Sequence, residues 1–128
     1  LATLTGAVVV ALGHELTGAM GNDEELINEL IESGKRTSEG VWPLPILDLH
    51  KDEMKGNVGD LRNISGPSTG AGSSTGGAFL SYFVSETSWV HLDIAGSAWG
   101  AAQRDYQGGE KGTGVGVRLL MDYLRSTK

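Results

Sequence analysis

The first third of the chain contains one strongly amphipathic segment, which predicts a helix. Asn22 or Asp23 can cap its first turn, and the acidic residues that follow favour the positive end of the helix dipole. Gly34 is expected to end the helix, because glycine readily takes the left-handed conformation found just after helices. The apolar positions recur at helical spacing and form one stripe of Leu26, Ile27, Leu30 and Ile31.

A second amphipathic helix is predicted at the other end of the chain. Val117, Leu120, Met121 and Leu124 follow the i, i+3, i+4, i+7 spacing that is typical of one helix face. Thr113 precedes this stripe and is expected to cap the helix.

Strict alternation over residues 89–95 predicts a strand. Val90, Leu92 and Ile94 fall on one face of it, and His91 and Asp93 fall on the other. A strand with this pattern has one apolar face for a core and one face that presents polar side chains.

Shorter segments connect these elements. Prolines push residues 41–45 into an extended conformation, and residues 16–20 and 61–64 are each predicted as a short strand. Residues 48–55 favour a short helix. Residues 66–77 are rich in glycine, serine and threonine, and they predict a loop that turns into a helix carrying Phe79, Leu80, Phe83 and Val84.

Residues 7–12 are compatible with two conformations. Three consecutive valines favour a strand, whereas the flanking Gly6 and Gly13 suit a short buried helix. This apolar run is too short to span a bilayer, and no basic stretch precedes it as in a signal peptide. Strands that alternate with helices, without a long linker, predict one α/β unit built in layers.

Composition narrows the possible partners. Sixteen acidic against ten basic residues give a net charge of -6, which argues against nucleic acid and against anionic membrane surfaces. The absence of cysteine excludes disulfides, a CxxC zinc site and a thiol nucleophile. The chain begins at Leu1 inside an apolar segment, which suggests a fragment, a processed product or an excised domain.

Two groups of polar residues could carry chemistry, but a structural role is favoured for both. Asp48, His50 and Asp52 would share a face on a strand, yet on the expected helix they fan apart and make a metal site improbable. His91 and Asp93 could act as a general base with its orienting partner. No nucleophile stands beside them, so buried structural hydrogen bonding is favoured.

The glycine-rich stretch from Gly108 to Gly116 precedes the last helix and invites comparison with phosphate loops. Amide groups at a helix N-terminus can bind an anion. Lys111 is followed by Gly112, however, so there is no Walker A motif, and a flexible loop with a helix cap is favoured.

Three short segments stand in a distinctive order: ATLTGA at residues 2–7, DLRNI at 60–64 and WVHLDIAG at 89–96. The glycine-rich loop before residues 78–80 and the glycine-rich loop before the last helix lie between and after them. Together these segments resemble the leucyl aminopeptidase family, the cytosolic zinc or manganese type, over nearly the whole chain.

This resemblance implies a fold and a reaction. The fold is a mixed β-sheet flanked by helices in three layers, and residues 1–128 would be the C-terminal part of a catalytic domain that usually assembles as a homo-hexamer in the cytoplasm. Residues 7–12 would be a helix after a strand that ends near Leu4. The reaction is release of leucine-like N-terminal residues from peptides by two divalent metal ions, zinc or manganese.

The resemblance places the metal ligands and the catalytic lysine and arginine upstream, in segments that this sequence lacks. It therefore implies no metal ligand and no catalytic residue in this chain, which alone is expected to be inactive. What matches is the substrate side: the Leu4 carbonyl would accept a hydrogen bond from the peptide, and the Gly6 amide would donate one. The pocket for the N-terminal side chain would be lined by Thr3, Ile64, Ala95 and Ala98.

Two other classes of function remain open at this point. The chain could be a non-catalytic binding module that uses the Gly108–Gly116 loop for a phosphate-containing ligand. It could also be a purely structural assembly piece, because an incomplete α/β sheet leaves an edge that must pair with something.

Overall fold

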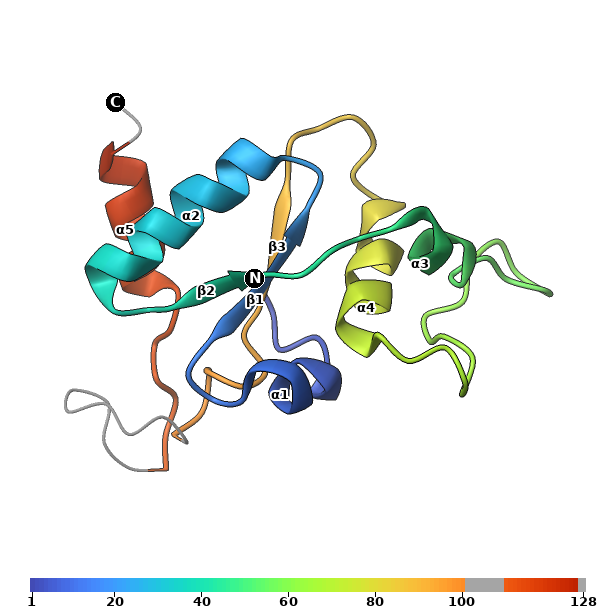
Figure 1. Cartoon of the computed structure of the whole chain (residues 1–128), viewed down its shortest axis with the longest axis horizontal. Helices are drawn as coiled ribbons and strands as arrows, with labels where there is room; N and C mark the ends of the chain where they lie inside the picture. Colours follow the sequence, from blue (N-terminus) through green and yellow to red (C-terminus); the bar gives the residue numbers. More distant parts are fainter. Residues whose placement is uncertain (101–109, 127–128) are drawn as a thin grey trace.

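The computed structural model describes residues 1–100 and 110–126, which form a small sheet with helices on both sides (Figure 1). The strands are β1 (Thr17–Gly21), β2 (Val41–Pro43) and β3 (Val90–Asp93). The helices are α1 (Gly6–Leu12), α2 (Glu24–Thr37), α3 (Asp48–Asp52), α4 (Gly72–Ser81) and α5 (Val117–Ser126).

The sheet is mixed, with the strand order β2-β1-β3. β1 pairs with β2 in parallel and with β3 in antiparallel fashion, and Ala19 faces Pro43 on one side and Leu92 on the other. The start of the chain extends the sheet next to β3. There the Ala2 amide donates to the Leu92 carbonyl at 3.1 Å, and the Ala2 carbonyl accepts from the Ile94 amide at 2.9 Å.

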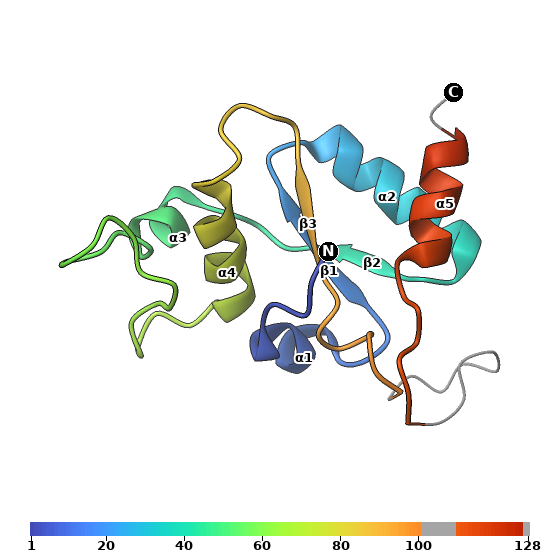
Figure 2. The same ribbon diagram turned by 180° about the vertical axis from the view of Figure 1, so that it is seen from behind.

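Helices α2 and α5 cover one face of this sheet (Figure 2). The apolar stripe of α2 packs there, as its periodicity predicts, and buries Leu30 almost completely. The core on this face is formed by Ala19, Leu30, Val41, Leu92 and Leu119.

Helices α1 and α4 cover the opposite face, where close approach depends on glycine. A Cβ on Gly18 of β1 would lie 2.9 Å from Val8 of α1, and a Cβ on Gly77 of α4 would lie 3.0 Å from the sulfur of Met20. Side chains at these positions would push the helices off the sheet. The predicted three-layer α/β arrangement is therefore confirmed.

Helix α1 resolves the ambiguity at residues 7–12 in favour of a helix. Thr5 caps it, because its hydroxyl accepts from the Val8 amide at 3.1 Å. The strand expected to end near Leu4 is reduced to the single bridge between Ala2 and Asp93.

Helix α2 starts as predicted but continues three residues beyond Gly34. Asp23 caps its first turn by accepting from the Leu26 amide at 3.0 Å. Ser38, in the left-handed conformation with φ of 58°, ends the helix instead of Gly34. Gly34 is glycine for a different reason: a Cβ there would lie 2.5 Å from the Glu39 carbonyl oxygen, which folds back over it.

Two further expectations were wrong in the middle of the chain. Residues 61–64 do not form a strand, since only Leu61 pairs, in an isolated bridge with Lys55. Helix α4 ends at Ser81, so Phe83 and Val84 follow it in a turn and are not part of it.

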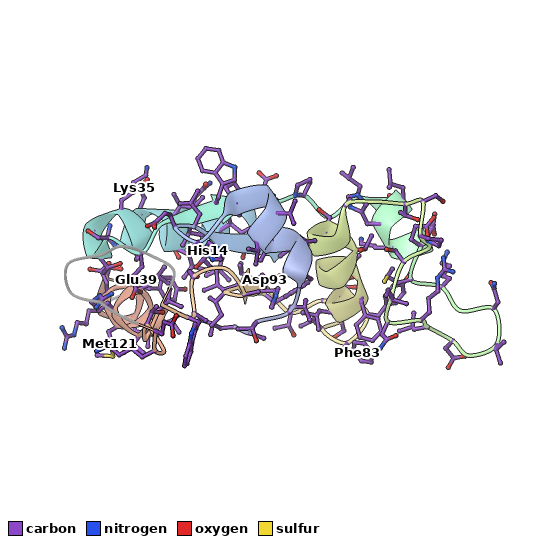
Figure 3. All side chains as sticks on the ribbon, turned by 90° about the horizontal axis from the view of Figure 1, so that it is seen from below. His14, Lys35, Glu39, Phe83, Asp93 and Met121 are labelled. Atoms are coloured by element: carbon purple, nitrogen blue, oxygen red, sulfur yellow. The ribbon has the colours of Figure 1, made fainter. Side chains whose placement is uncertain are left out.

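Helix α5 is in the predicted place but turns a different side to the core. Leu119 is 2% exposed, whereas Val117 and Leu124 of the predicted stripe are 65% and 63% exposed. Met121 likewise lies on the outer side of the helix (Figure 3). Thr113 lies four positions before the first residue of α5 and does not cap it: its hydroxyl donates to the Ser97 carbonyl at 2.7 Å and accepts from the Val115 amide, before the helix, at 3.3 Å. None of the helices in residues 1–100 and 110–126 is long and apolar enough to cross a membrane.

Candidate functional site

A buried carboxylate at the carboxyl end of β3 organises the candidate site. Asp93 is fully buried, and its Oδ1 accepts from the amides of Leu4 at 3.0 Å and Ala95 at 3.2 Å. Its Oδ2 accepts from the Thr5 amide at 3.1 Å and from the Thr5 hydroxyl at 2.7 Å. Asp93 therefore ties the segment before α1 to the turn after β3, and it lies in the interior (Figure 3).

This arrangement brings five of the six predicted substrate-binding residues to one edge of the sheet. Thr3, Leu4 and Gly6 follow the bridge at Ala2 directly, and Ala95 is joined to Leu4 through Asp93. The turn after β3 also holds Ala98, whose amide donates to the Ile94 carbonyl at 2.9 Å and whose carbonyl accepts from Thr113 at 3.0 Å.

Several backbone groups at this edge have no hydrogen-bond partner within the described part of the chain. They include the Leu4 carbonyl and the Gly6 amide, the same groups that the resemblance assigns to peptide binding. Thr3, Leu4 and Gly6 are also exposed. The edge thus offers a free acceptor and a free donor, among other backbone groups, to a ligand.

The sixth predicted residue, Ile64, reaches the same region from a separate loop. A cavity of about 500 Å³ beside α1 has Leu4, Gly6 and Ile64 in its wall. Ile64 is 75% exposed, so it can contact a ligand there without repacking the core. The rest of the wall is made by Thr5, Ala7, Met54, Asn63, Ser65, Gly72, Thr75, Gly76 and Phe79.

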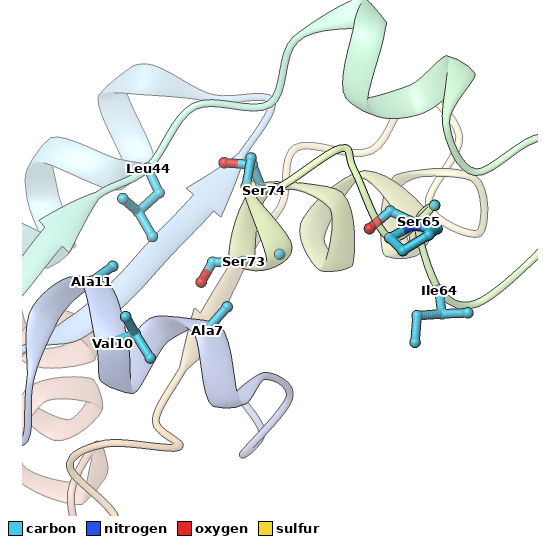
Figure 4. A pocket seen from close by; sticks show the side chains of 13 residues that line it. Ala7, Val10, Ala11, Leu44, Ile64, Ser65, Ser73 and Ser74 are labelled. Carbon is cyan, nitrogen blue, oxygen red and sulfur yellow. The ribbon is translucent and has the colours of Figure 1, made fainter.

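A second cavity of about 610 Å³ continues from the first. The two share Ala7, Ile64, Ser65 and Gly72 in their walls. Figure 4 shows side chains of α1, of the first turn of α4 and of the Ile64–Ser65 loop around this second cavity. An extended ligand seated beside Leu4 and Gly6 could therefore continue past Ile64.

Glycines in α4 allow this helix to form one wall of the cavities. A Cβ on Gly72 would lie 2.8 Å from the Ala7 Cβ, and a Cβ on Gly76 would lie 2.9 Å from the Thr5 side chain. A side chain at either position would collide with α1 or its cap, so glycine allows the close approach of α4. The glycine-rich composition of residues 66–77 was visible in the sequence, but its purpose was not.

The loop that carries Ile64 is anchored by residues that sequence reasoning missed. Glu53 accepts from the guanidinium of Arg62 at 3.1 Å and from the Thr69 hydroxyl at 2.9 Å, and the Arg62 Nε donates to the Glu53 carbonyl at 2.7 Å. These partners are 9 and 16 positions from Glu53 along the chain, so no local spacing could have indicated them.

The polar residues of α3 have separate partners. His50 is buried and its Nδ1 accepts from the Leu47 amide at 3.1 Å, while the side chain of Asp48 is 98% exposed. Asp52 pairs with Lys55 at 2.7 Å. In the described part of the chain, no three His, Asp or Glu side chains are grouped as a metal site would require.

His91 and Asp93 do not form a base with its orienting partner. Asp93 directs its oxygens at backbone amides and at Thr5, whereas the buried Nε2 of His91 has no hydrogen-bond partner among the described residues. Burial lowers the pKa of His91 below its usual value, and the charge of Asp93 opposes this only in part. The structural role expected for Asp93 is what the hydrogen bonds show.

The amides at the start of α5, which could bind an anion, already bind the carboxylate of Glu39. Gly108 and Gly109 lie outside the described residues, but the amides of Gly116 and Leu119 both donate to Oε2 of Glu39, at 3.0 Å each. Arg118 adds a contact at 2.8 Å to the other Glu39 oxygen. A phosphate at this helix N-terminus would have to displace a fully buried carboxylate (Figure 3).

Fold and site together define a layered α/β protein with a cavity between α1, α4 and the loop that carries Ile64. Comparison with known sequences agrees with this class: the model of the cytosol aminopeptidase family, catalytic domain, matches residues 1–121. The chain belongs to the cytosol aminopeptidase family.

Relatives with the name probable cytosol aminopeptidase align along almost the whole chain. The one from Geobacter sp. (strain M21) is 50% identical over 131 residues, which cover 98% of this chain and 25% of that protein. The one from Neisseria meningitidis serogroup A / serotype 4A is 46% identical over 127 residues, with coverage of 98% and 25%. The chain therefore spans about a quarter of the length of these relatives.

Proposed function

We propose that this chain is a segment of a two-metal aminopeptidase that releases leucine-like N-terminal residues from peptides. The observation that carries the proposal is the free Leu4 carbonyl and Gly6 amide beside a cavity, in a member of the cytosol aminopeptidase family. The described residues do not fit a metal ion. The proposal therefore assigns the zinc or manganese ions, and the catalytic groups, to an upstream portion of the same enzyme.

In this proposal the chain binds and orients the peptide. The Leu4 carbonyl accepts a peptide N–H and the Gly6 amide donates to a peptide carbonyl, which holds the substrate extended along the edge beside β3. Orientation of this kind supplies a large part of enzymatic rate enhancement, because it removes the entropy cost of bringing groups together.

The side-chain pocket sets a modest preference. Thr3, Ile64, Ala95 and Ala98 would contact the N-terminal side chain with small or apolar groups, which suits leucine. An apolar pocket discriminates a single methylene by only about 1–3 kcal/mol, so the range of accepted residues should be broad.

Assembly and location follow the family in the same proposal. A homo-hexamer in the cytoplasm would receive peptides as substrates, and the upstream portion of the same enzyme would be a partner of this chain. The exposed apolar side chains of α5 are compatible with contacts to further protein.

The test is hydrolysis of a chromogenic leucine amide with added manganese. The chain alone should be silent, and the chain mixed with the upstream portion of the enzyme should release the chromophore. Activity from the chain alone would mean that the metal site has been placed wrongly. Silence of the mixture, with both parts folded and associated, would remove the aminopeptidase assignment.

A further inference from the structure

We propose that Asp93 is a positioning residue for the peptide: together with Thr5 it sets the direction of the Leu4 carbonyl and the Gly6 amide. This inference rests on the proposed function, because it concerns how the peptide-binding backbone is held. Leu4 and Thr5 are 89 and 88 positions from Asp93 along the chain.

Among the described residues, the Asp93 carboxylate serves only as a hydrogen-bond acceptor. It is fully buried, and within the described residues no basic side chain pairs with it. Its charge is balanced instead by hydrogen-bond donors from Leu4, Thr5 and Ala95, at 2.7 to 3.2 Å. A buried carboxylate is costly unless such donors satisfy it, so its position and theirs are fixed together.

Asp93 orients the peptide plane between Leu4 and Thr5. A trans peptide directs its N–H and its C=O to opposite sides. The N–H of this plane belongs to Thr5 and points inward to Asp93 at 3.1 Å. The carbonyl of the same plane belongs to Leu4, so it is turned away from Asp93 and remains free for a ligand.

The direction of the Gly6 amide is set through Thr5. The Thr5 hydroxyl donates to Asp93 at 2.7 Å and accepts from the Val8 amide at 3.1 Å, which makes it both a partner of Asp93 and the cap of α1. Thr5 is therefore held as the residue before the first turn. Gly6 follows as the first helical residue, whose amide points out of the helix end and has no partner in the described chain.

Only a carboxylate can accept hydrogen bonds from all of the donors around Asp93. Both Asp93 oxygens face N–H or O–H donors, and each accepts at least two hydrogen bonds. Asparagine has nearly the same shape but would direct an NH2 group at one set of these donors. Either the Leu4 and Ala95 amides or the Thr5 amide and hydroxyl would then lose their acceptor while the packing remained.

The experiment compares a leucyl dipeptide with the corresponding ester, leucyl-lactate, in the full-length enzyme that contains this chain. A dipeptide has one backbone N–H, which is the group available to the Leu4 carbonyl, and the ester replaces it with oxygen. Asp93→Asn should lower kcat/KM for the dipeptide at least about tenfold, and for the ester clearly less, because the ester never used the misdirected carbonyl.

Thr5 provides a matched pair of second variants. Thr5→Ser keeps the hydroxyl and should resemble the wild type, whereas Thr5→Val keeps the shape, removes the hydroxyl and should show the same dipeptide-selective loss. Asp48→Asn is the control for the Asp93 substitution, because Asp48 is exposed. Thermal unfolding shows whether each variant is folded. If Asp93→Asn does not fold, the comparison rests on Thr5→Val.

The outcomes separate the two proposals. An equal loss for dipeptide and ester in the folded variants would overturn the positioning role and leave a merely structural one. No wild-type hydrolysis of either substrate would instead contradict the proposed function.

Discussion

At the scale of single residues, neighbouring positions on β3 have very different environments. Asp93 satisfies its buried charge with donors from three residues, whereas the buried His91 has a nitrogen without a partner among the described residues. Both face the side of the sheet that α1 and α4 cover. The contrast shows that the same alternating pattern produced one anchored and one unsatisfied polar group.

His91 predicts a loss of stability on acidification. Its pKa in the folded protein is lowered by burial, while in the unfolded chain it stays near about 6.5, so below that pH the unfolded state binds more protons. The free energy of unfolding should therefore be highest above about pH 6.5 and fall as the pH decreases from there towards the folded pKa. Thermal unfolding at about pH 7.5, 6.5 and 5.5 measures this decline.

The variant His91→Leu should reduce the slope between these pH values, since it removes the titrating group from an already buried position. An unchanged slope in His91→Leu would assign the decline to other groups and contradict the prediction.

Ala98 provides a test of the side-chain pocket. Its amide and carbonyl are both hydrogen-bonded, so a larger side chain should leave the turn in place. In the proposed function this side chain would enter the pocket. In the full-length enzyme, Ala98→Phe should raise KM for a leucine amide about tenfold, within the range that apolar pockets discriminate. The same variant should change KM for a glycine amide much less. Equal effects on both substrates, or none, would mean that Ala98 does not line the pocket.

At the scale of elements, glycines decide how closely the helices approach the sheet and one another. Gly72 and Gly76 let α4 reach α1 and Thr5, and Gly34 lets the Glu39 carbonyl fold over α2. The start of α5 depends on a similar close approach. The carbonyl of Glu39 folds over α2, and its carboxylate accepts hydrogen bonds from the amides of Gly116 and Leu119. Tertiary approach, and not helix propensity, explains these residues.

Gly34→Ala tests this explanation against the ordinary propensity rule. In an exposed helix interior, alanine in place of glycine stabilises by about 1 kcal/mol. Here the new Cβ would lie 2.5 Å from a backbone oxygen, so the variant should instead be destabilised, by about 1–3 kcal/mol. Urea unfolding measures the difference. Glu29→Ala, at an exposed position of the same helix, is the control and should stay within about 0.5 kcal/mol of the wild type.

At the scale of the whole molecule, the chain is a sheet between two layers of helices, with free backbone groups at one edge and no cluster of metal ligands among its described residues. Its exposed apolar side chains on α5 fit the proposal that further protein contacts this helix. The relatives, about four times longer, fit the same interpretation.

Metal addition distinguishes the chain from the larger enzyme. A ligand that binds only the folded state raises the midpoint of thermal unfolding. Millimolar manganese or zinc should leave the midpoint of the isolated chain unchanged, and should raise that of the full-length enzyme after removal of metal with a chelator. A metal-dependent rise in the isolated chain would show a site that the proposal does not contain.

The sequence by itself determined the elements that depend on local patterns. The apolar stripe of α2, the alternation of β3 and the extended segment at residues 41–45 are recognisable because periodicity and proline act over a few neighbouring residues. The order of three short motifs likewise indicated the family that the comparisons show.

Only the tertiary structure decided the features that depend on distant partners. Helix α5 is apolar over a wide arc, and the position of α2, not the spacing, selected Leu119 for burial and left Val117 and Leu124 exposed. Leu4 and Thr5 are 89 and 88 positions from Asp93, and Gly116 and Leu119 are 77 and 80 positions from Glu39. Hydrogen bonds between residues so far apart produce no periodic pattern in the sequence, because only folding brings these residues together.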